Sequence, residues 1–418
     1  MANDTKRSLK TKIWFESFLA TILVFGVIWV LFYIINISFK PFNYVTKALK
    51  EVQLTDIYFS QLHNDNADTT IILVNIENID RSGIANLIKK INQAGPKVIA
   101  IDVFFSKDVE VPGDSLLDDA LQSAGSKVVL AEFLNPENNQ PDTTFKIFQY
   151  CEYGHANLPN NEDGTEVVRS FFPVVTHDNK DKWAFSAVVA GKYSPESFEK
   201  LKSRNKNEEL INFTGDILSY AEIQHDDIMR SSDASLKFIK NKIVILGFTG
   251  GKCRQSSDIE DLFYTPVNRH YYGRSHPDMY GAVIHANIIS MILKGNYIQL
   301  VPEWLVICIS FVLVYFHVVL FIWLFVRHHI WYHLAVKLIQ LISFAFILLG
   351  IFYLFRLSLI LVYTKYMLLG VILSVDILYF YEALALIAHR TMGSRSFFIE
   401  HHEVKNNNII EKDIDNKL

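Results

Sequence analysis

The sequence has few of the residues and motifs that mark enzymes and nucleic-acid-binding proteins. Its 418 residues include three cysteines, and no G-x-S-x-G, H-E-x-x-H or P-loop motif occurs. The formal net charge is -4, so no excess of basic residues favours nucleic acid as a partner. We therefore expect no enzymatic activity, no catalytic residue, no cofactor and no metal ligand in this chain.

The few cysteines leave one structural question open. Cys151 and Cys253 fall in the central part of the chain, whereas Cys308 falls in an apolar run. In an oxidising compartment the first two could form a disulfide bond. Two free, buried thiols are the alternative, and the sequence does not choose between them.

Long apolar runs account for a hydrophobic share of 50% and a mean hydropathy of +0.18. The first run, residues 13–37, is long enough to cross a membrane as a helix. Basic residues in segment 1–12 place the N-terminus in the cytoplasm. A cleaved signal peptide is the competing interpretation, but the run is too long and no small-residue cleavage site follows it.

Three more apolar runs in the last third of the chain predict three further membrane helices. They cover residues 303–326, 334–355 and 363–388, with a short hairpin around Arg356 before the last one. Four helices place segments 1–12 and 389–418 in the cytoplasm and residues 38–301 outside. The prediction is a multi-pass protein of the inner (cytoplasmic) membrane with a large periplasmic or extracellular domain.

Two carboxylates interrupt the last apolar run, namely Asp376 and Glu382. A charged group that faces lipid is unfavourable, so both should face other helices or a partner. A proton or ion path is the alternative interpretation, which would make the chain a transport-associated membrane subunit.

Strand-like and helix-like segments alternate in the external region. Apolar β-rich runs cover residues 70–77, 97–106, 127–133 and 243–246, and helical periodicity covers 80–94 and 114–124. This alternation predicts an α/β fold with a mostly parallel sheet flanked by helices. A hairpin is expected around residues 178–179, a strand at 210–213, and a loop with a short helix at 220–229.

Candidate binding residues follow the predicted strands. Glu77 and Asp102 stand at the ends of neighbouring parallel strands, which face one crevice in α/β sheets. Two carboxylates there could bind a cation, or the amines and hydroxyls of a small ligand. Alternatively, Asp102 accepts hydrogen bonds from backbone N–H groups of the loop that follows it.

The segment from Lys242 to Leu293 reads as strand, long polar loop and helix, and it holds the other candidates. Asp261 and Thr265 lie in its loop, where they could fix a polar ligand or order the loop itself. His285 and Asn287 lie near the start of its helix. This histidine could sense pH or could be a hydrogen-bonded core residue.

Four sequence patches resemble the type-two CHASE domain, an extracytoplasmic sensor module of bacterial signalling proteins. They are Val98 to Ser106, Gly154-His-Ala-Asn157 with Asp163-Gly164 and Val168-Arg169, Lys242 to Gly247 with Asp261 to Pro266, and Gly281 to Asn287. The resemblance covers about residues 41–298 and continues through the three predicted helices after them. One departure is an amide, Asn75, at an acidic position of the first strand.

The resemblance implies a membrane-anchored receptor that binds an unknown small-molecule or protein signal. Members of the family typically continue into a cytoplasmic output domain, whereas about thirty residues follow the last helix here. The expectation is therefore a homodimer that passes its signal through the membrane helices to a separate cytoplasmic or membrane effector protein. The rival hypothesis is an envelope scaffold that docks a periplasmic partner.

Overall fold

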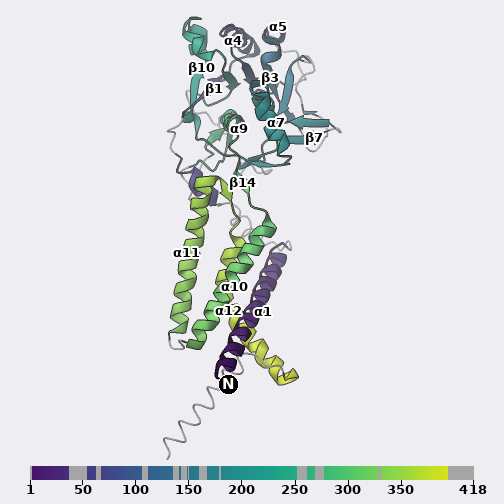
Figure 1. Ribbon diagram of the computed structural model, residues 1–418. Helices are drawn as coiled ribbons and strands as arrows, with labels where there is room; N and C mark the ends of the chain where they lie inside the picture. The colour runs from purple at the N-terminus through teal and green to yellow at the C-terminus, as the bar shows by residue number, and fades with distance from the viewer. Residues whose placement is uncertain are drawn as a thin grey trace, which may run out of the picture. The chain divides into compact units, whose positions relative to one another are not determined.

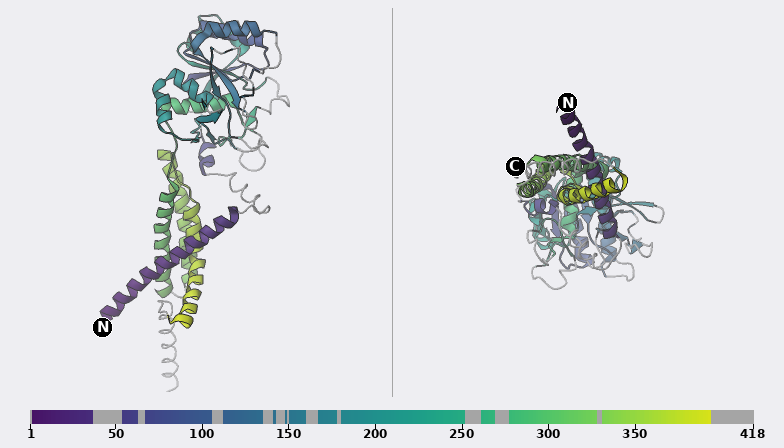
Figure 2. Two further views of the ribbon diagram at one scale, coloured as in Figure 1. Left: turned by 90° about the vertical axis from the view of Figure 1, so that its right-hand side faces the viewer. Right: turned by 90° about the horizontal axis from the view of Figure 1, so that it is seen from below.

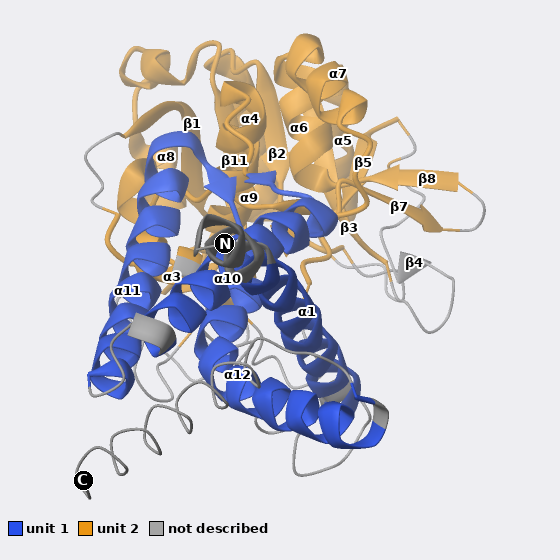
Figure 3. Ribbon diagram, turned by 60° about the horizontal axis from the view of Figure 1, so that its bottom comes forward, with its two compact units in different colours: residues 1–50, 299–418 blue, residues 51–298 orange. Residues whose placement is uncertain are grey.

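The structure is a computed structural model, and it consists of two compact units. One unit comprises residues 1–50 and 299–418, and the other comprises residues 51–298 (Figure 3). The residues that the structure describes are 2–36, 54–62, 67–105, 112–134, 141–142, 148, 150–159, 167–177, 180–251, 261–268, 277–327 and 331–393. Below, residues 51–298 are called the external unit and the remainder the membrane unit.

A parallel sheet forms the centre of the external unit. Within the described residues its parallel strands run in the order β10-β1-β11-β2-β3-β5, and β4 pairs antiparallel with the end of β3. The strands are β1 (Asp68–Asn75), β2 (Val98–Ile101), β3 (Val128–Leu134), β4 (Pro141–Asp142), β5 (Glu152–His155), β10 (Tyr220–Gln224) and β11 (Ile243–Gly247). The late strand β11 lies between the earlier strands β1 and β2.

Helices cover both faces of this sheet, which explains why the inner strands are apolar throughout. Figure 1 shows α4 (Arg81–Gln93) and α5 (Asp114–Ala124) on one side and α9 (Gly281–Lys294) on the other. Helices α6 (Phe185–Tyr193) and α9 pack against each other and against the sheet, and α7 (Pro195–Ser203) packs beside them. The predicted mixed α/β fold with a mainly parallel sheet is therefore confirmed.

Local sequence signals set several of these boundaries. The Asp80 side chain accepts a hydrogen bond from the Gly83 N–H at 2.7 Å and so begins α4. Gly95, at a φ of 74°, follows the helix and turns the chain toward β2. Ser194 caps α7, whose first residue is a proline that needs no hydrogen-bond acceptor for its nitrogen.

Two predictions for the region before β11 differ from the structure. Residues 220–224, expected as loop, form the edge strand β10, which pairs with β1 only. Its sequence, Tyr-Ala-Glu-Ile-Gln, lacks an apolar run because an edge strand is partly exposed. Of the strand expected at 210–213, only one residue is in β9 (Glu209–Leu210), which pairs antiparallel with β6 (Ser170–Phe171) outside the main sheet.

Several short elements complete the external unit. The expected hairpin around residues 178–179 is formed by β7 (Val174–His177) and β8 (Lys180–Trp183). The others are α3 (Leu54–Phe59), η1 (Gly125–Lys127), η3 (Ile217–Ser219), α8 (His225–Arg230), η4 (Ser235–Ile239), β12 (Leu262–Phe263) and β13 (Met279–Tyr280). Strands β12 and β13 pair with each other directly before α9.

The described part of the membrane unit has four helices that are long and apolar enough to cross a membrane. The candidate spans are Lys12–Ile34, Glu303–Phe325, Tyr332–Ser358 and Lys365–Thr391. They belong to α1 (Ala2–Asn36), α10 (Glu303–Arg327), α11 (Tyr332–Ser358) and α12 (Lys365–Met392). Helix α1 crosses the others obliquely (Figure 2).

The turn between α11 and α12 lies later than the sequence suggested. Arg356 is inside α11, and the helix ends at Ser358 because Leu359 adopts a left-handed conformation with φ of 55°. The next two residues form β15 (Ile360–Leu361), which pairs parallel with β14 (Gln299–Leu300). Helix α11 is therefore one continuous element through Arg356.

Candidate functional site

A cavity of about 430 Å³ lies at the carboxyl ends of β1, β2 and β11, where open α/β sheets bind ligands. Four of the six predicted binding residues line it: Glu77, Asp102, Asp261 and His285. The other lining residues are Ile76, Asn78, Val103, Phe104, Ala156, Leu158, Phe248, Phe263, Gly281 and Ala282. The described lining therefore carries three carboxylates, one histidine and three phenylalanines, and neither lysine nor arginine.

Asp102 is the most unusual group in this lining. It directly follows β2, and among the described residues no hydrogen-bond donor or cation reaches its carboxyl group. Burial without such a partner disfavours the charged form and raises the pKa of Asp102 to about 7. The described residues of the loop that follows, Val103 to Phe105, donate no such bond, and residues 106–111 lie outside the described part of the chain. Loop capping and ligand binding therefore both stay possible roles for this carboxyl group.

Two glycines let the surrounding backbone approach Asp102. A Cβ atom on Gly247 would lie 2.8 Å from the Ala282 Cβ and 3.4 Å from the Asp102 Cβ. A Cβ atom on Gly281 would lie 3.8 Å from the Asp102 Oδ2 atom. Helix α9 thus begins beside Asp102, and no side chain caps its N-terminus.

Glu77 is held at the cavity by the residue two positions before it. The buried Asn75 side chain accepts hydrogen bonds from the N–H groups of Glu77 at 3.1 Å and Thr249 at 3.2 Å. Its amide group donates to the Gln224 side chain at 2.9 Å and to the Gly250 carbonyl at 2.6 Å. An aspartate cannot donate those bonds, which explains the amide at the end of β1.

His285 is a buried member of the cavity wall. Its Nδ1 atom lies 2.8 Å from the Ser186 hydroxyl, and its ring packs edge-on against Phe185 at 5.2 Å between ring centroids. Burial lowers the pKa of His285 to about 4. Burial, together with the nearby His285, also lowers the pKa of His155 to about 4. Both rings are therefore neutral at pH 7, and Asp102 is better placed than His285 to respond to pH near neutrality.

Thr265 and Asn287, the other two predicted binding residues, do not line the cavity. The Thr265 N–H and hydroxyl donate to the Asp278 carboxylate at 2.8 and 2.6 Å. The fully buried Asn287 side chain donates to the Gly215 carbonyl at 3.1 Å and accepts from the Thr214 N–H at 2.8 Å. These bonds hold loops against the start of α9, so both residues support the site from outside it.

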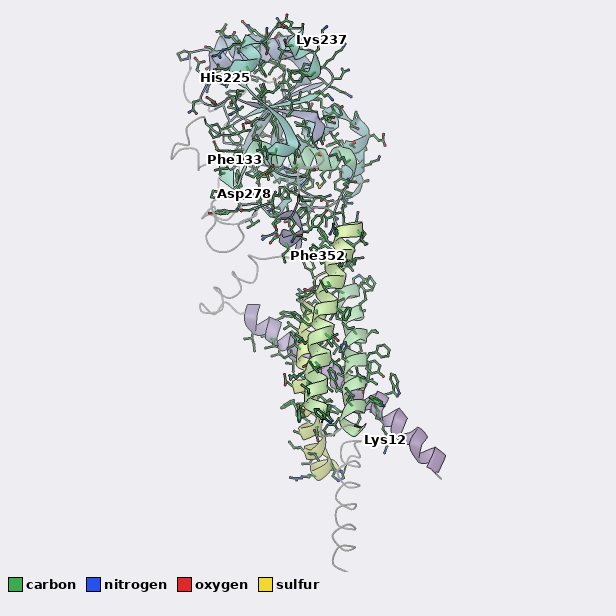
Figure 4. The ribbon with its side chains drawn as sticks, turned by 90° about the vertical axis from the view of Figure 1, so that its left-hand side faces the viewer. Lys12, Phe133, His225, Lys237, Asp278 and Phe352 are labelled. Atoms are coloured by element: carbon green, nitrogen blue, oxygen red, sulfur yellow. The ribbon has the colours of Figure 1, made fainter. Side chains whose placement is uncertain are left out.

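The sequence pointed to carboxylates in this region but not to its phenylalanines or to a second acidic cavity beside it. Phe248 directly follows β11, and Phe263 lies in β12, so both reach the sheet edge through their strands. A second cavity of about 430 Å³ shares Glu77 and is lined by further carboxylates, including Glu222 and Asp278. Asp278, which is labelled in Figure 4, comes directly before β13 in the chain, and burial raises its pKa to about 6.

The remaining predicted site residues lie elsewhere. Cys151 is buried, and burial raises the pKa of its thiol to about 12. Cys253 lies outside the described residues, so a disulfide bond and two free thiols both stay open. Asp376 is exposed on α12, whereas Glu382 on the same helix is half-buried. In the described part of the chain, no three His, Cys, Asp or Glu side chains are grouped so that they could hold a metal ion.

Comparison with known proteins points to one family. The model of that family, described as the CHASE2 domain, matches residues 27–326. No curated protein and no solved structure matches the chain.

Proposed function

Because the chain belongs to the CHASE2 domain family, whose domains are extracytoplasmic sensors, we propose that its external unit binds a small signal molecule in the cavity beside Asp102. The carboxyl group of Asp102 carries this proposal, because it lies half-buried at the sheet edge where ligands bind, with no hydrogen-bond donor or cation against it among the described residues. A carboxylate kept in such a place destabilises the fold unless something binds it.

The lining indicates the chemical class of the ligand. Asp102, Glu77 and Asp261 supply three carboxylates, and no described lining residue supplies a compensating cation. Three phenylalanine rings add apolar surface that also attracts cations. An organic amine matches both features: its ammonium group would pair with the carboxylates, and its carbon chain would contact the rings.

Helix α9 connects the cavity to the membrane unit along the chain. Ala282 and His285 on its first turns line the cavity, and Lys294 is its last residue. Residues 295–302 alone separate it from α10. A ligand that binds one position of α9 more tightly would shift the helix toward that position, since only differential affinity moves an equilibrium. We propose that an effector protein reads this shift at the membrane helices.

Ligand binding is testable by thermal unfolding of the purified full chain with putrescine, ethanolamine and choline as probes. We expect at least one of them to stabilise the external unit, by about 2.7 kcal/mol when its concentration is a hundred times its Kd. Asp102→Asn should remove that stabilisation. Asp119→Asn, on the exposed surface of α5, should retain it. If no amine stabilises the chain, or if D102N responds as the wild type does, this ligand class is wrong.

The effector is testable by isolating the tagged full chain from membranes of its own host after chemical cross-linking. We expect a protein with a cytoplasmic signalling domain to be recovered with it. Recovery of periplasmic partners only would contradict the receptor proposal and support the scaffold hypothesis.

A further inference from the structure

Two exposed charged side chains of the membrane unit lie more than one helical turn from the ends of their candidate membrane spans. Lys337 lies on α11 and Asp376 on α12, each inside a candidate membrane span. Neither side chain forms a hydrogen bond or an ion pair with any described residue. Lipid supplies neither a counterion nor a hydrogen-bond partner for such groups, so something else must cover them in the membrane.

Three other polar side chains of these spans have partners or lie at helix ends. His317 on α10 bonds to the Leu313 carbonyl and to the Ser343 hydroxyl, each at 2.8 Å. Lys365 pairs with Glu303 at 2.8 Å, at the ends of two helices. Arg356 is exposed, but it lies within one turn of the end of α11, from where its long side chain can reach the interface. Lys337 and Asp376 therefore stand apart.

Two contacts fix the relative height of Lys337 and Asp376. The Gln340 amide on α11 donates to the carbonyls of Val371 and Ile372 on α12, at 2.8 and 3.0 Å. On the other side, the Tyr379 hydroxyl lies 3.0 Å from His333 Nδ1, and the two rings stack. The helices run antiparallel here, so counting from either contact places the lysine and the aspartate within one to two residue rises of the same level, ~1.5–3 Å.

We propose that this face, the Lys337–Asp376 patch, is where two copies of the chain associate in the membrane. Around a twofold axis along the membrane normal, Asp376 of one copy meets Lys337 of the other, and the reverse contact forms as well. Opposite charges that are exposed at nearly one level on two neighbouring helices can pair with those of a second copy under this symmetry. The surface therefore fits a second copy of this chain and needs no further subunit.

Apolar side chains surround the charges and supply the packing area. Ile372 and Phe380 stand four residues to either side of Asp376 on α12, and they are 43% and 55% exposed. Leu341 stands four residues after Lys337 on α11 and is 66% exposed. The ion pairs would set the register of the interface, and these residues would fill it. This interface is independent of which signal the external unit binds.

Charge reversal and mixing test the interface in nanodisc-reconstituted full-length chains that carry two different tags. Wild-type chains should be recovered as a pair through either tag. K337D makes the patch wholly acidic and D376K makes it wholly basic, so each variant should pair with itself at least tenfold less. Coexpressed with each other, the two variants should recover wild-type pairing, because every acidic patch then meets a basic one.

The mixed pair separates this interface from an ion pair formed within one chain. If Lys337 and Asp376 served only each other in the same protomer, mixing two defective chains would restore nothing. Arg356→Asp, a reversal on α11 outside the patch, should pair as the wild type does. The proposal is overturned if wild-type chains are not recovered together, if the single reversals pair normally, or if mixing gives no recovery.

Discussion

Replacing Asp102 by asparagine is expected to stabilise the external unit, and the gain should grow with pH. Folding raises the pKa of this carboxyl group from 3.8 to about 7, so the folded state holds the proton more tightly than the unfolded state does. Wild-type stability therefore falls as pH rises from about 4 to 7 and is level above. The asparagine of the variant does not ionise, so the variant does not lose stability at this position as pH rises.

The expected size follows from 1.36 kcal/mol for each pH unit between the two pKa values. Between pH 5.5 and pH 8 the advantage of D102N should widen by about 2 kcal/mol, and the whole effect has an upper limit of roughly 4 kcal/mol. Chemical denaturation of the detergent-solubilised chain at both pH values measures it. An equal difference between variant and wild type at both pH values would contradict the assigned environment of Asp102.

Other titrating groups change the pH profile of both proteins alike. The pKa values of His155 and His285 are lowered to about 4 in the folded state. The free energy of unfolding that these two groups contribute is therefore lost as pH falls from 6.5 toward 4. This trend opposes that of Asp102, and it cancels when variant and wild type are compared at the same pH. Asp119→Asn is the matched control, because replacing an exposed carboxylate on α5 should not change how the free energy of unfolding depends on pH.

If D102N proves more stable than the wild type near neutral pH, folding alone does not explain the carboxylate at this position, and a functional role is supported. Binding of an ammonium group beside Asp102 would favour the ionised form and lower its pKa again. The pH-dependent loss of stability should therefore shrink in the presence of a ligand that pairs with this group. Both the stability measurement and the ligand screen therefore depend on Asp102. A negative result in one of them does not predict a negative result in the other.

The central fold was predictable because its strands are buried on both faces and its helices are strongly periodic. Strands β1, β2, β3 and β11 are short apolar runs, and α4 carries its buried residues at helical spacing. The edge strand β10 has neither signal, since it is partly exposed and pairs on one side only. A hydrophobic sequence pattern indicates buried positions, and an edge strand has few of them.

The location of the candidate site followed from topology, whereas the roles of single residues did not. Carboxylates placed after parallel strands were expected at one sheet edge, and the structure brings Glu77 and Asp102 to one cavity there. Two hydrogen-bond partners of Asn287, Gly215 and Thr214, are 72 and 73 residues away in the chain. Local sequence cannot reveal that such an amide is fully used in holding a loop, and the same is true of the bonds between Thr265 and Asp278.

Replacing Arg169 by methionine is expected to cause the largest loss of stability in the external unit. Its guanidinium group donates to both carboxylate oxygens of Asp56, at 2.9 and 2.7 Å, and the Asp56 side chain is completely buried. Removing one partner of such a pair leaves a buried charge uncompensated, which costs about 3–5 kcal/mol. For a unit of this size, the melting temperature should fall by roughly 6 to 20 °C.

The same substitution at an exposed ion pair is the matched control. Arg230 lies 3.4 Å from Asp226 with its side chain 79% exposed, so R230M should cost at most about 1 kcal/mol. Thermal unfolding of the full chain, followed by tyrosine and tryptophan fluorescence, compares the two variants. A loss in R169M no larger than that in R230M would contradict the assigned role of the buried pair.

A second variant separates two effects of R169M, namely the uncompensated charge left on Asp56 and the lost packing contacts of the arginine. Asp56→Asn keeps hydrogen-bonding capacity at this position but removes the charge that R169M leaves behind. If the uncompensated charge dominates, the double variant D56N/R169M should be more stable than R169M alone, by at least about 1 kcal/mol. If packing of the arginine dominates, the second substitution should not help. We expect recovery, because Asp56 is the fully buried partner and Arg169 retains 13% exposure, so the penalty falls on the carboxylate.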